Sequence, residues 1–233
     1  MGPPWRTPSP GARAFRAWQK TCRPSPALAS GGMTPERPSA LPLPDGLPAT
    51  VPVRAAFEVL VRSSPAALVH HAVRSTLLAA DLGLRLVLPV DDEVLAVAGL
   101  LHDTGLTPGF DAHAAPFEVA GGNVAWAVTA GAGWAPERRD RTARAVVDHM
   151  LDDDEVPPHE RPEGYLLARS TGADVSGRGL EHWSAPFRDD LEARWPRLDF
   201  RDLFSAYLRD QAARKPSSVV AAYVAAGGAD RVR

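Results

Sequence analysis

The sequence predicts an all-α protein, and two observations lead to this expectation. From about Val51 onward, apolar residues recur with helical spacing, and clusters of Pro, Gly or acidic residues separate the apolar segments. No segment of convincing length alternates apolar and polar residues, and Leu84–Val90 is the one strand-like run. A chain of 233 residues, 45% of them hydrophobic, is long enough to bury a sizeable core. We therefore expect one helical domain over residues 49–233, preceded by a tail.

Residues 1–48 differ from the rest of the chain in composition and charge. They hold eleven of the 23 prolines, and their six Lys and Arg against two Asp and Glu give a net charge of +4. Because the whole chain carries −2, residues 49–233 carry −6. A Pro-rich basic segment buries too little apolar area to offset the entropy of ordering, so we expect a disordered tail. A partner-binding arm is one interpretation, and a segment without a role is the favoured one.

The first two helices follow directly after this tail. Val53–Arg62 forms the first. Ser64 and Pro65 have the residue types of an N-cap and a first helical position, so they open a second helix. This helix should run to about Asp81 and end near Gly83.

The third helix, about Asp92–Asp103, is the most apolar in the chain. Acidic residues at its start favour the helix dipole, and apolar residues on all its sides predict a central, buried position. Gly105 is a natural terminator just past its end. Further helices are expected over about Pro116–Ala130, Pro136–Leu151, Glu160–Thr171, Pro186–Arg194, Phe200–Arg214 and Ser217–Ala226.

Composition excludes several classes of function. A body of net charge −6 without a cluster of Lys and Arg argues against binding of nucleic acid. The sequence has no run of about 18 apolar residues, which is the length that a membrane-spanning helix needs. Arg and Pro interrupt the N-terminus, where a signal peptide needs a continuous apolar core. Cys22, the one cysteine, excludes an intrachain disulfide and a thiolate zinc site. We expect a cytoplasmic protein that acts on a small molecule and that could form a homo-oligomer.

Three positions in the helical body have the residue types of a metal site. They are His71, the adjacent pair His102 and Asp103, and Asp174. A carboxylate and an imidazole at the end of so apolar a helix are costly unless a bound cation or a hydrogen-bond network compensates them. Imidazole and carboxylate ligands suit zinc, iron or manganese. The residues alone favour a satisfied core histidine over a ligand, and they do not distinguish His70 from His71.

The surrounding residues resemble a known family. The strings His71-Ala72-Val73-Arg74, Leu100-Leu101-His102-Asp103-Thr104-Gly105-Leu106 and Gly172-Ala173-Asp174 resemble the HD-domain metal-dependent hydrolase superfamily. Four further pieces resemble its cyanamide hydratase-like branch: Phe117-Glu118-Val119 with Gly122-Asn123, Val146-Val147-Asp148-His149, Trp195-Pro196-Arg197-Leu198-Asp199-Phe200, and Lys215-Pro216. The resemblance covers about residues 53–225. One departure is His70, where this branch tends to have Asn before the ligand histidine.

The resemblance implies one divalent metal ion, Zn²⁺ in the first place, with Fe²⁺ or Mn²⁺ as alternatives. Its ligands would be His71, His102, Asp103 and Asp174, because the His-x-x-Arg register selects His71. A mononuclear site is favoured over a di-iron one. The implied reaction is the attack of a metal-bound hydroxide on a nitrile such as cyanamide, which yields urea.

Catalysis would also need residues that carry a proton and orient the substrate. His149 is the first candidate for the proton shuttle and Glu118 the second. Without a catalytic role, His149 would be a surface histidine and Glu118 a first-turn carboxylate that favours the helix dipole. Asn123 and His70 are candidates for substrate contacts. Two alternatives remain open: an HD-type phosphohydrolase acting on a nucleotide or another phosphate ester, and a non-catalytic scaffold that binds a ligand. The acidic body mildly disfavours a polyanionic substrate.

Overall fold

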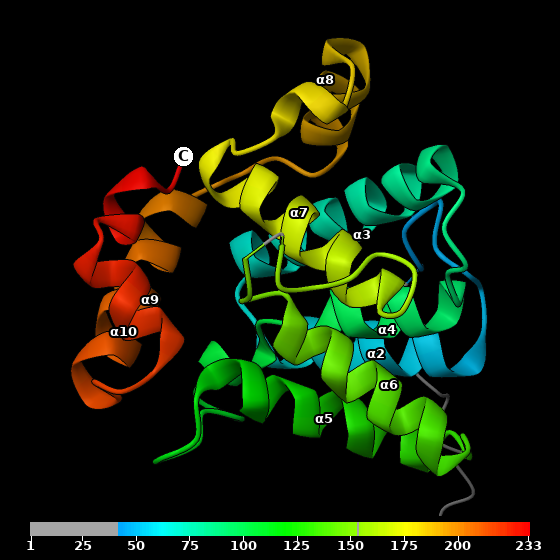
Figure 1. The fold of residues 1–233 in the computed structure, drawn as a ribbon, viewed down its shortest axis with the longest axis horizontal. Coiled ribbons are helices and arrows are strands. Elements are labelled where there is room, and N and C mark those ends of the chain that lie inside the picture. Colours follow the sequence, from blue (N-terminus) through cyan, green and yellow to red (C-terminus); the bar gives the residue numbers. More distant parts are fainter. Residues whose placement is uncertain (1–41, 153) are drawn as a thin grey trace, which may run out of the picture. The chain divides into compact units, whose positions relative to one another are not determined.

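The computed structural model describes residues 42–152 and 154–233, and in these residues every regular element is a helix (Figure 1). The α-helices are α2 (Val51–Ser63), α3 (Ala66–Leu86), α4 (Asp92–Leu101), α5 (Phe117–Gly131), α6 (Pro136–Asp148), α7 (Pro162–Ser176), α8 (Ala185–Arg194), α9 (Phe200–Arg214) and α10 (Val219–Ala225). Three short 3₁₀ helices are η2 (Thr104–Leu106), η3 (Leu180–His182) and η4 (Gly228–Arg231). The all-α prediction is confirmed. None of the described helices is long and apolar enough to cross a membrane.

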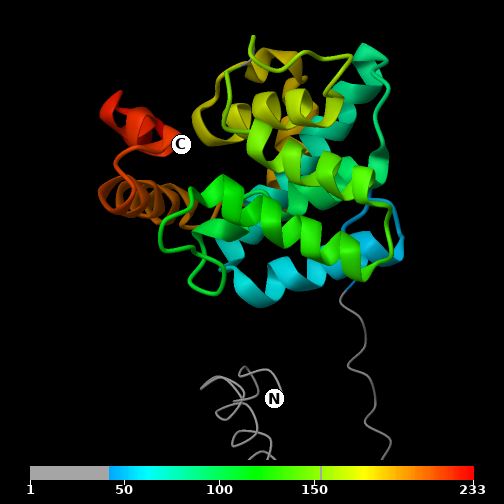
Figure 2. The same cartoon turned by 60° about the horizontal axis from the view of Figure 1, so that its bottom comes forward.

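Helix α4 is the centre of the fold, as its composition predicts. It packs against α2, α3, α5, α6 and α7, and its residues from Val94 to Leu101 are all buried. The neighbouring helices α5 and α6 lie side by side in both views (Figures 1 and 2). Surrounding one apolar helix with five others removes its apolar residues from water, which is the main driving force for this arrangement.

A second, smaller core lies at the C-terminal end of the chain. It joins α9, α10 and η4 to the first turn of α3 and the start of α5 through Leu68, Phe117, Phe200, Phe204 and Leu208. In Figure 1 the orange and red helices α9 and α10 lie to one side of the other helices. This core matters for function because it borders the residues that form the site described below.

Helix α3 corrects one of the sequence predictions. It continues past Gly83 to Leu86, so the first three residues of the strand-like run Leu84–Val90 are helical and the run forms no strand. A Cβ on Gly83 would lie 2.9 Å from Cδ1 of Leu166, so this glycine serves the close packing of α3 against α7. Val87, with φ at +53°, ends the helix in the left-handed conformation instead.

The start of the packed body also differs from the prediction. Residues 1–41 lie outside the described part of the chain, and so does most of the predicted tail. Within residues 42–48, however, Leu43 and Leu47 pack against the main core and Pro44 is buried. Apolar contacts therefore extend the body upstream of the predicted boundary at residue 49.

The N-terminus of α4 is fixed by one charged residue. The side chain of Asp91 caps the helix by accepting hydrogen bonds from the backbone N–H groups of Glu93 and Val94. Arg138 of α6 donates two hydrogen bonds to the same carboxylate, from Nε at 2.8 Å and from Nη2 at 2.7 Å. Burial alone would raise the pKa of Asp91, but the hydrogen bonds and charge of Arg138 outweigh it and hold this pKa below its usual value.

We predict that Asp91→Ala lowers the free energy of unfolding by about 1–2 kcal/mol at pH 7, because it removes a cap and the partner of Arg138. The folded-state pKa of Asp91 is lowered, so the stabilisation by its charge is present above the ordinary aspartate pKa of 3.8 and is lost as the pH falls below it. Urea unfolding at pH 7 and at pH 3 measures both effects. The control is Asp92→Ala, which alters an exposed first-turn carboxylate and should change stability by less than about 0.5 kcal/mol. An equal loss from both variants would contradict this role of Asp91.

Candidate metal centre

The turn that follows α4 delivers two polar side chains into the interior. The helix ends at Leu101, and His102 and Asp103 lead into η2. A Cβ on Gly105 would lie 2.0 Å from the carbonyl oxygen of Phe117, so only glycine allows α5 to pack directly on this turn. The packing fixes the turn and leaves His102 and Asp103 buried.

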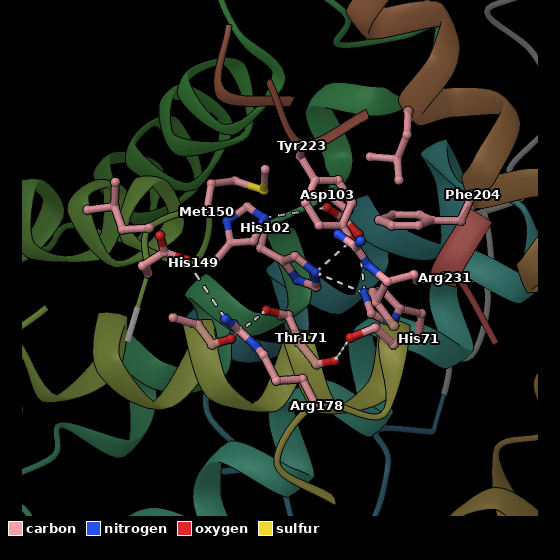
Figure 3. Close-up of a pocket in the computed structure, with 17 residues that line it drawn as sticks. His71, His102, Asp103, His149, Met150, Thr171, Arg178, Phe204, Tyr223 and Arg231 are labelled. Atoms are coloured by element: carbon pink, nitrogen blue, oxygen red, sulfur yellow. Dashed lines mark hydrogen bonds and ion pairs between the residues drawn. The ribbon is translucent and has the colours of Figure 1, made fainter. Parts of the chain in front are cut away.

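Three side chains meet beyond this turn (Figure 3). Nε2 of His71, from α3, lies 3.2 Å from Nε2 of His102 and 3.3 Å from Oδ2 of Asp103. Nε2 of His102 lies 3.1 Å from the same carboxylate oxygen. All three residues are buried, and their ligand atoms lie within 4.8 Å of one another. These residues can hold a metal ion, as the sequence predicts for all three.

The environment of Asp103 shows why this cluster suits a cation. Both carboxylate oxygens of Asp103 are buried, and among the described residues only the imidazoles of His71, His102 and His149 lie near enough to pair with them. A buried charge left in this way costs several kcal/mol unless it is paired or coordinates a metal. The two Nε2 atoms of His71 and His102 also face one another at 3.2 Å, and two lone pairs at this distance repel unless a proton or a cation lies between them. The donor set therefore fits a divalent metal ion.

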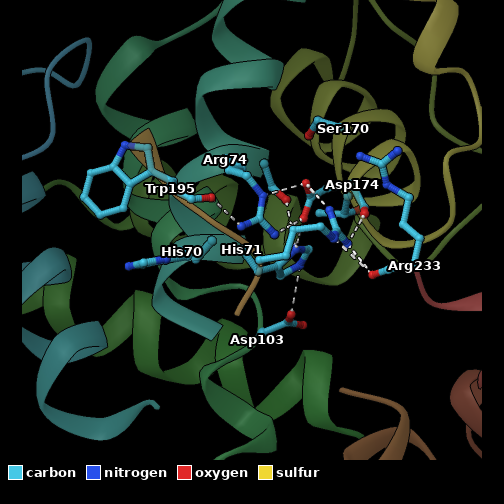
Figure 4. Close-up of polar contacts among 12 residues, drawn as sticks. His70, His71, Arg74, Asp103, Ser170, Asp174, Trp195 and Arg233 are labelled. Atoms are coloured by element: carbon cyan, nitrogen blue, oxygen red, sulfur yellow. Dashed lines mark hydrogen bonds and ion pairs between the residues drawn. The ribbon is translucent and has the colours of Figure 1, made fainter. Parts of the chain in front are cut away.

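Asp174 of α7, predicted as a fourth ligand, occupies a different position (Figure 4). Its Oδ2 accepts a hydrogen bond from Nδ1 of His71 at 2.7 Å, on the side of the imidazole opposite to the cluster. Arg74 donates to both of its carboxylate oxygens, at 2.8 and 2.7 Å, and Nη1 of Arg197 lies 3.3 Å from Oδ1. In this arrangement Asp174 orients His71 and is bonded to guanidinium groups, and its predicted role as a fourth metal ligand stays a prediction.

The pKa values of His71 and Asp174 follow from the same contacts. Burial alone would lower the pKa of His71, but the carboxylates of Asp103 and Asp174 outweigh it and raise this pKa. Burial would raise the pKa of Asp174, whereas Arg74 and His71 hold it well below its usual range. Without a metal, His71 therefore tends to keep a proton between two negative groups, and a bound cation would replace that proton.

Phe200 contacts His71 directly and Arg197 fixes its partner Asp174, and neither role was predicted from the sequence. The ring of Phe200 stacks on the imidazole of His71, with centroids 4.5 Å apart. Arg197 also donates from Nη2 to the backbone oxygen of Asp174 at 2.8 Å, which ties α7 to the segment before α9. Both residues belong to the string Trp195–Phe200 that carries part of the family resemblance, so that string was the signal that could have identified them.

His149 does approach the cluster, as predicted. It follows the end of α6 and is buried, and its Nε2 lies 3.8 Å from Oδ1 of Asp103. Its ring centroid is 4.9 Å from that of His102, and its Nδ1 is hydrogen bonded to the backbone oxygen of Val146. Burial and the neighbouring charge of His102 lower the pKa of His149 to about 4, so its imidazole is neutral at pH 7.

A cavity of about 280 Å³ opens beside the cluster (Figure 3). Most of its other walls come from α7, from Phe204 and Leu208 of α9, and from Tyr223 and Arg231 near the C-terminal end. The lining residues are His71, His102, Asp103, His149, Met150, Leu151, Asp152, Ala168, Thr171, Gly172, Val175, Ser176, Arg178, Phe204, Leu208, Tyr223 and Arg231. A cavity that touches His71, His102 and Asp103 gives a small molecule access to a metal held there.

The remaining predicted site residues do not line this cavity. Glu118 is buried in the first turn of α5 near Lys215, and burial raises its pKa. Asn123 lines a separate open groove with Phe110 and Val124, because it lies on the other face of α5. Nδ1 of His70 bonds to the backbone oxygen of Pro196 at 2.7 Å, which turns its ring away from His71. The predicted shuttle role of Glu118 and the predicted substrate contacts of Asn123 and His70 stay predictions, and none of the three residues lies in the wall of this cavity.

The comparison with known families adds one finding. Residues 68–167 match the HD domain family. The matched segment contains His71, His102, Asp103 and His149, and it ends before Asp174. No curated protein matches the sequence.

We predict that His71→Ala abolishes binding of a divalent metal, whereas His70→Ala leaves it unchanged, because only His71 points at Asp103. The metal content of the purified proteins, determined after reconstitution with Zn²⁺ and removal of excess ion, measures the difference. The two variants change adjacent residues of one helix, so each serves as the control for the other. Equal metal loss from both would show that the register of α3 is not the one described here.

Proposed function

We propose, on the premise that this chain belongs to the HD-domain superfamily, that it is a metal-dependent enzyme that adds water to a small molecule. The observation that carries this proposal is the buried carboxylate of Asp103, whose neighbours of opposite charge are imidazoles only and which lies against a cavity. His71, His102 and Asp103 would hold the ion. When bound, a divalent metal lowers the pKa of a water molecule toward neutrality and polarises the substrate.

For the substrate we propose a nitrile, of which cyanamide is the smallest example. Apolar side chains form much of the cavity wall, among them Val175, Phe204 and Leu208. An uncharged, rod-shaped nitrile can lie against such a wall without losing strong hydrogen bonds to water. A cavity of about 280 Å³ exceeds the needs of cyanamide, so substituted nitriles belong to the proposed range.

Hydration of a nitrile requires the transfer of protons at the reacting atoms. Water adds its oxygen to the nitrile carbon and a proton to the nitrogen, and the product rearranges to an amide, which is urea for cyanamide. His149 is placed to pass this proton, since its imidazole is neutral at pH 7, lines the cavity and has Nε2 3.8 Å from Oδ1 of Asp103. The apolar wall would keep other water away from the reacting atoms.

We predict that the zinc-loaded protein converts cyanamide to urea and that Asp103→Ala removes both the activity and the metal. Urea formation, followed by ¹³C NMR with labelled cyanamide, measures turnover, and Fe²⁺- and Mn²⁺-loaded protein provides the comparison between metals. Asn123→Ala should retain full activity, because Asn123 lies in a separate groove. Metal-loaded protein without turnover of nitriles or phosphate esters would contradict an enzymatic role and favour the ligand-binding scaffold.

Hydrolysis of a phosphate ester is a second candidate, and two lining residues favour it. Arg178 and Arg231 belong to the cavity wall, and guanidinium groups bind phosphate oxygens well. Both also have partners within the protein. Nη1 of Arg178 lies 3.9 Å from Asp152, and Nη1 of Arg231 donates to the backbone oxygen of Ala226 at 2.9 Å. These partners and the acidic body reduce the attraction for a polyanion, so the nitrile remains the first candidate.

We predict that Arg231→Gln separates the two candidates. If the substrate is a nitrile, its KM should change less than about twofold, since no charge is bound there. If the substrate is a phosphate ester, loss of a charged hydrogen bond of about 1.5–3 kcal/mol should raise KM by about 10- to 100-fold. Phosphate release from a panel of nucleotides and urea release from cyanamide are measured with the same two proteins. A rise of this size with cyanamide would contradict the nitrile proposal.

A further inference from the structure

One wall of the cavity comes from the C-terminal end of the chain, outside the residues 68–167 that match the HD domain family. Tyr223 of α10 and Arg231 of η4 belong to this wall, together with side chains of α9 (Figure 3). We propose that Tyr223 is a specificity-determining residue whose ring forms a subsite for an uncharged aromatic substituent of the substrate. This inference rests on the proposed function only for the identity of the reacting group, a nitrile.

Close contacts hold the ring of Tyr223 on this wall. A Cβ on the buried Gly228 would overlap Cδ1 and Cε1 of the ring, so the glycine lies directly against it. The guanidinium of Arg231 lies 5.7 Å from the ring centroid, and its Nη1 donates to the backbone oxygen of Ala226 at 2.9 Å. The ring also packs against the C-terminal core. A side chain held in this way loses little conformational freedom when a ligand packs on it.

The side chains around Tyr223 favour one class of substituent. Val175, Phe204 and Leu208 line the cavity with it, and all three are buried. An apolar group that moves from water onto such a wall is stabilised in proportion to the area it buries. An aromatic group is stabilised further, because ring faces and ring edges attract one another. A wall that contains both Phe204 and Tyr223 therefore favours an aromatic substituent over an aliphatic one of the same size.

The cavity has room for this substituent beside the reacting group. Its volume is about 280 Å³, and both the cluster of His71, His102 and Asp103 and the C-terminal wall border it. A nitrile is linear at its carbon, so a substituent on that carbon extends away from the reacting atoms. With the nitrile group at the cluster, we expect the substituent, and not the nitrile, to contact Tyr223.

The arginines that line the cavity do not favour a charged substituent. Arg231 is engaged with the ring of Tyr223 and the backbone of Ala226, and Nη1 of Arg178 lies 3.9 Å from Asp152. An anionic group would have to compete with these partners for the guanidinium groups. An uncharged ring would leave the partners in place, so it is the substituent that this wall accepts at the lower cost.

The test measures binding of 4-fluorotoluene, an uncharged aromatic probe, to the whole chain by ¹⁹F NMR. Tyr223→Ala should weaken binding by about 10-fold or more, because it removes the ring and the apolar area that the probe covers. Tyr223→Phe keeps the ring, so its affinity should stay within about twofold of the wild type. Tyr207→Ala is the matched control and should bind as the wild type does, because Tyr207 packs against the same core but is not among the residues that line the cavity. The anionic analogue 4-fluorobenzoate should bind the wild type more weakly than 4-fluorotoluene.

Turnover separates this inference from the proposed function. In the zinc-loaded protein, Tyr223→Ala should lower the ratio of kcat/KM for benzonitrile to that for cyanamide by about 10-fold or more, since only benzonitrile carries a ring. Circular dichroism establishes that each variant is folded.

Several outcomes would overturn the subsite: no binding of 4-fluorotoluene to the wild type, equal affinity in Tyr223→Ala, an equal loss in Tyr207→Ala, or tighter binding of 4-fluorobenzoate. An unchanged ratio in a protein that turns over both nitriles would also overturn it and leave the proposed function intact. Binding of the probe that depends on Tyr223, without turnover of any nitrile, would instead overturn the proposed nitrile chemistry and leave the subsite.

Discussion

The carboxylate of Asp103 is the constraint on which the site depends. It lies just past the C-terminus of α4, the most completely buried helix, and among the described residues only imidazoles lie near enough to pair with it. The C-terminal end of a helix carries partial negative charge, so a buried carboxylate there is unfavourable on two grounds. A cation held by the surrounding imidazoles would remove both costs. Metal binding at this site would therefore be coupled to folding.

Two buried aspartates in one site have opposite roles because their neighbours differ. Asp174 is neutralised by Arg74 and Arg197, and it uses its hydrogen bonds to fix the ring of His71. Asp103 has only imidazoles within ion-pairing distance among the described residues, so its charge remains available for a metal. Residue type alone gives both the same chemistry. The arrangement of guanidinium groups decides which of the two carboxylates is already paired with arginine.

The fold joins these residues from separate helices around α4. His71 comes from α3, His102 and Asp103 follow α4, and His149 follows α6, so three neighbours in the bundle each present one element to the same point. The C-terminal helices α9 and α10 close the other side and supply cavity wall. Packing of Phe200 on His71 links this wall to the cluster of His71, His102 and Asp103. A change in the C-terminal core would therefore alter the packing against His71 directly.

Much of the fold follows from local pattern. Helical periodicity, Pro at helix starts and the uniformly apolar segment before His102 correctly predicted an all-α body with α4 at its centre. Periodicity failed at Gly83, where a tertiary contact with Leu166, and not a helix end, requires the glycine. It also placed the start of the body too late, because the burial of Leu43 depends on a surface formed by distant residues.

The sequence by itself determined the residue types of the site, and the tertiary structure decided their roles. The string from Leu100 to Leu106 identified the pair His102 and Asp103, and the His-x-x-Arg spacing selected His71 over His70. Only the packing of α7 and of the segment before α9 showed that arginine side chains bond to the carboxylate of Asp174, since Arg74 and Asp174 lie 100 residues apart along the chain. Likewise, the rotation of α5 decided that Asn123 faces another groove. Spacing along a helix records which residues share a face, but it does not record what that face meets.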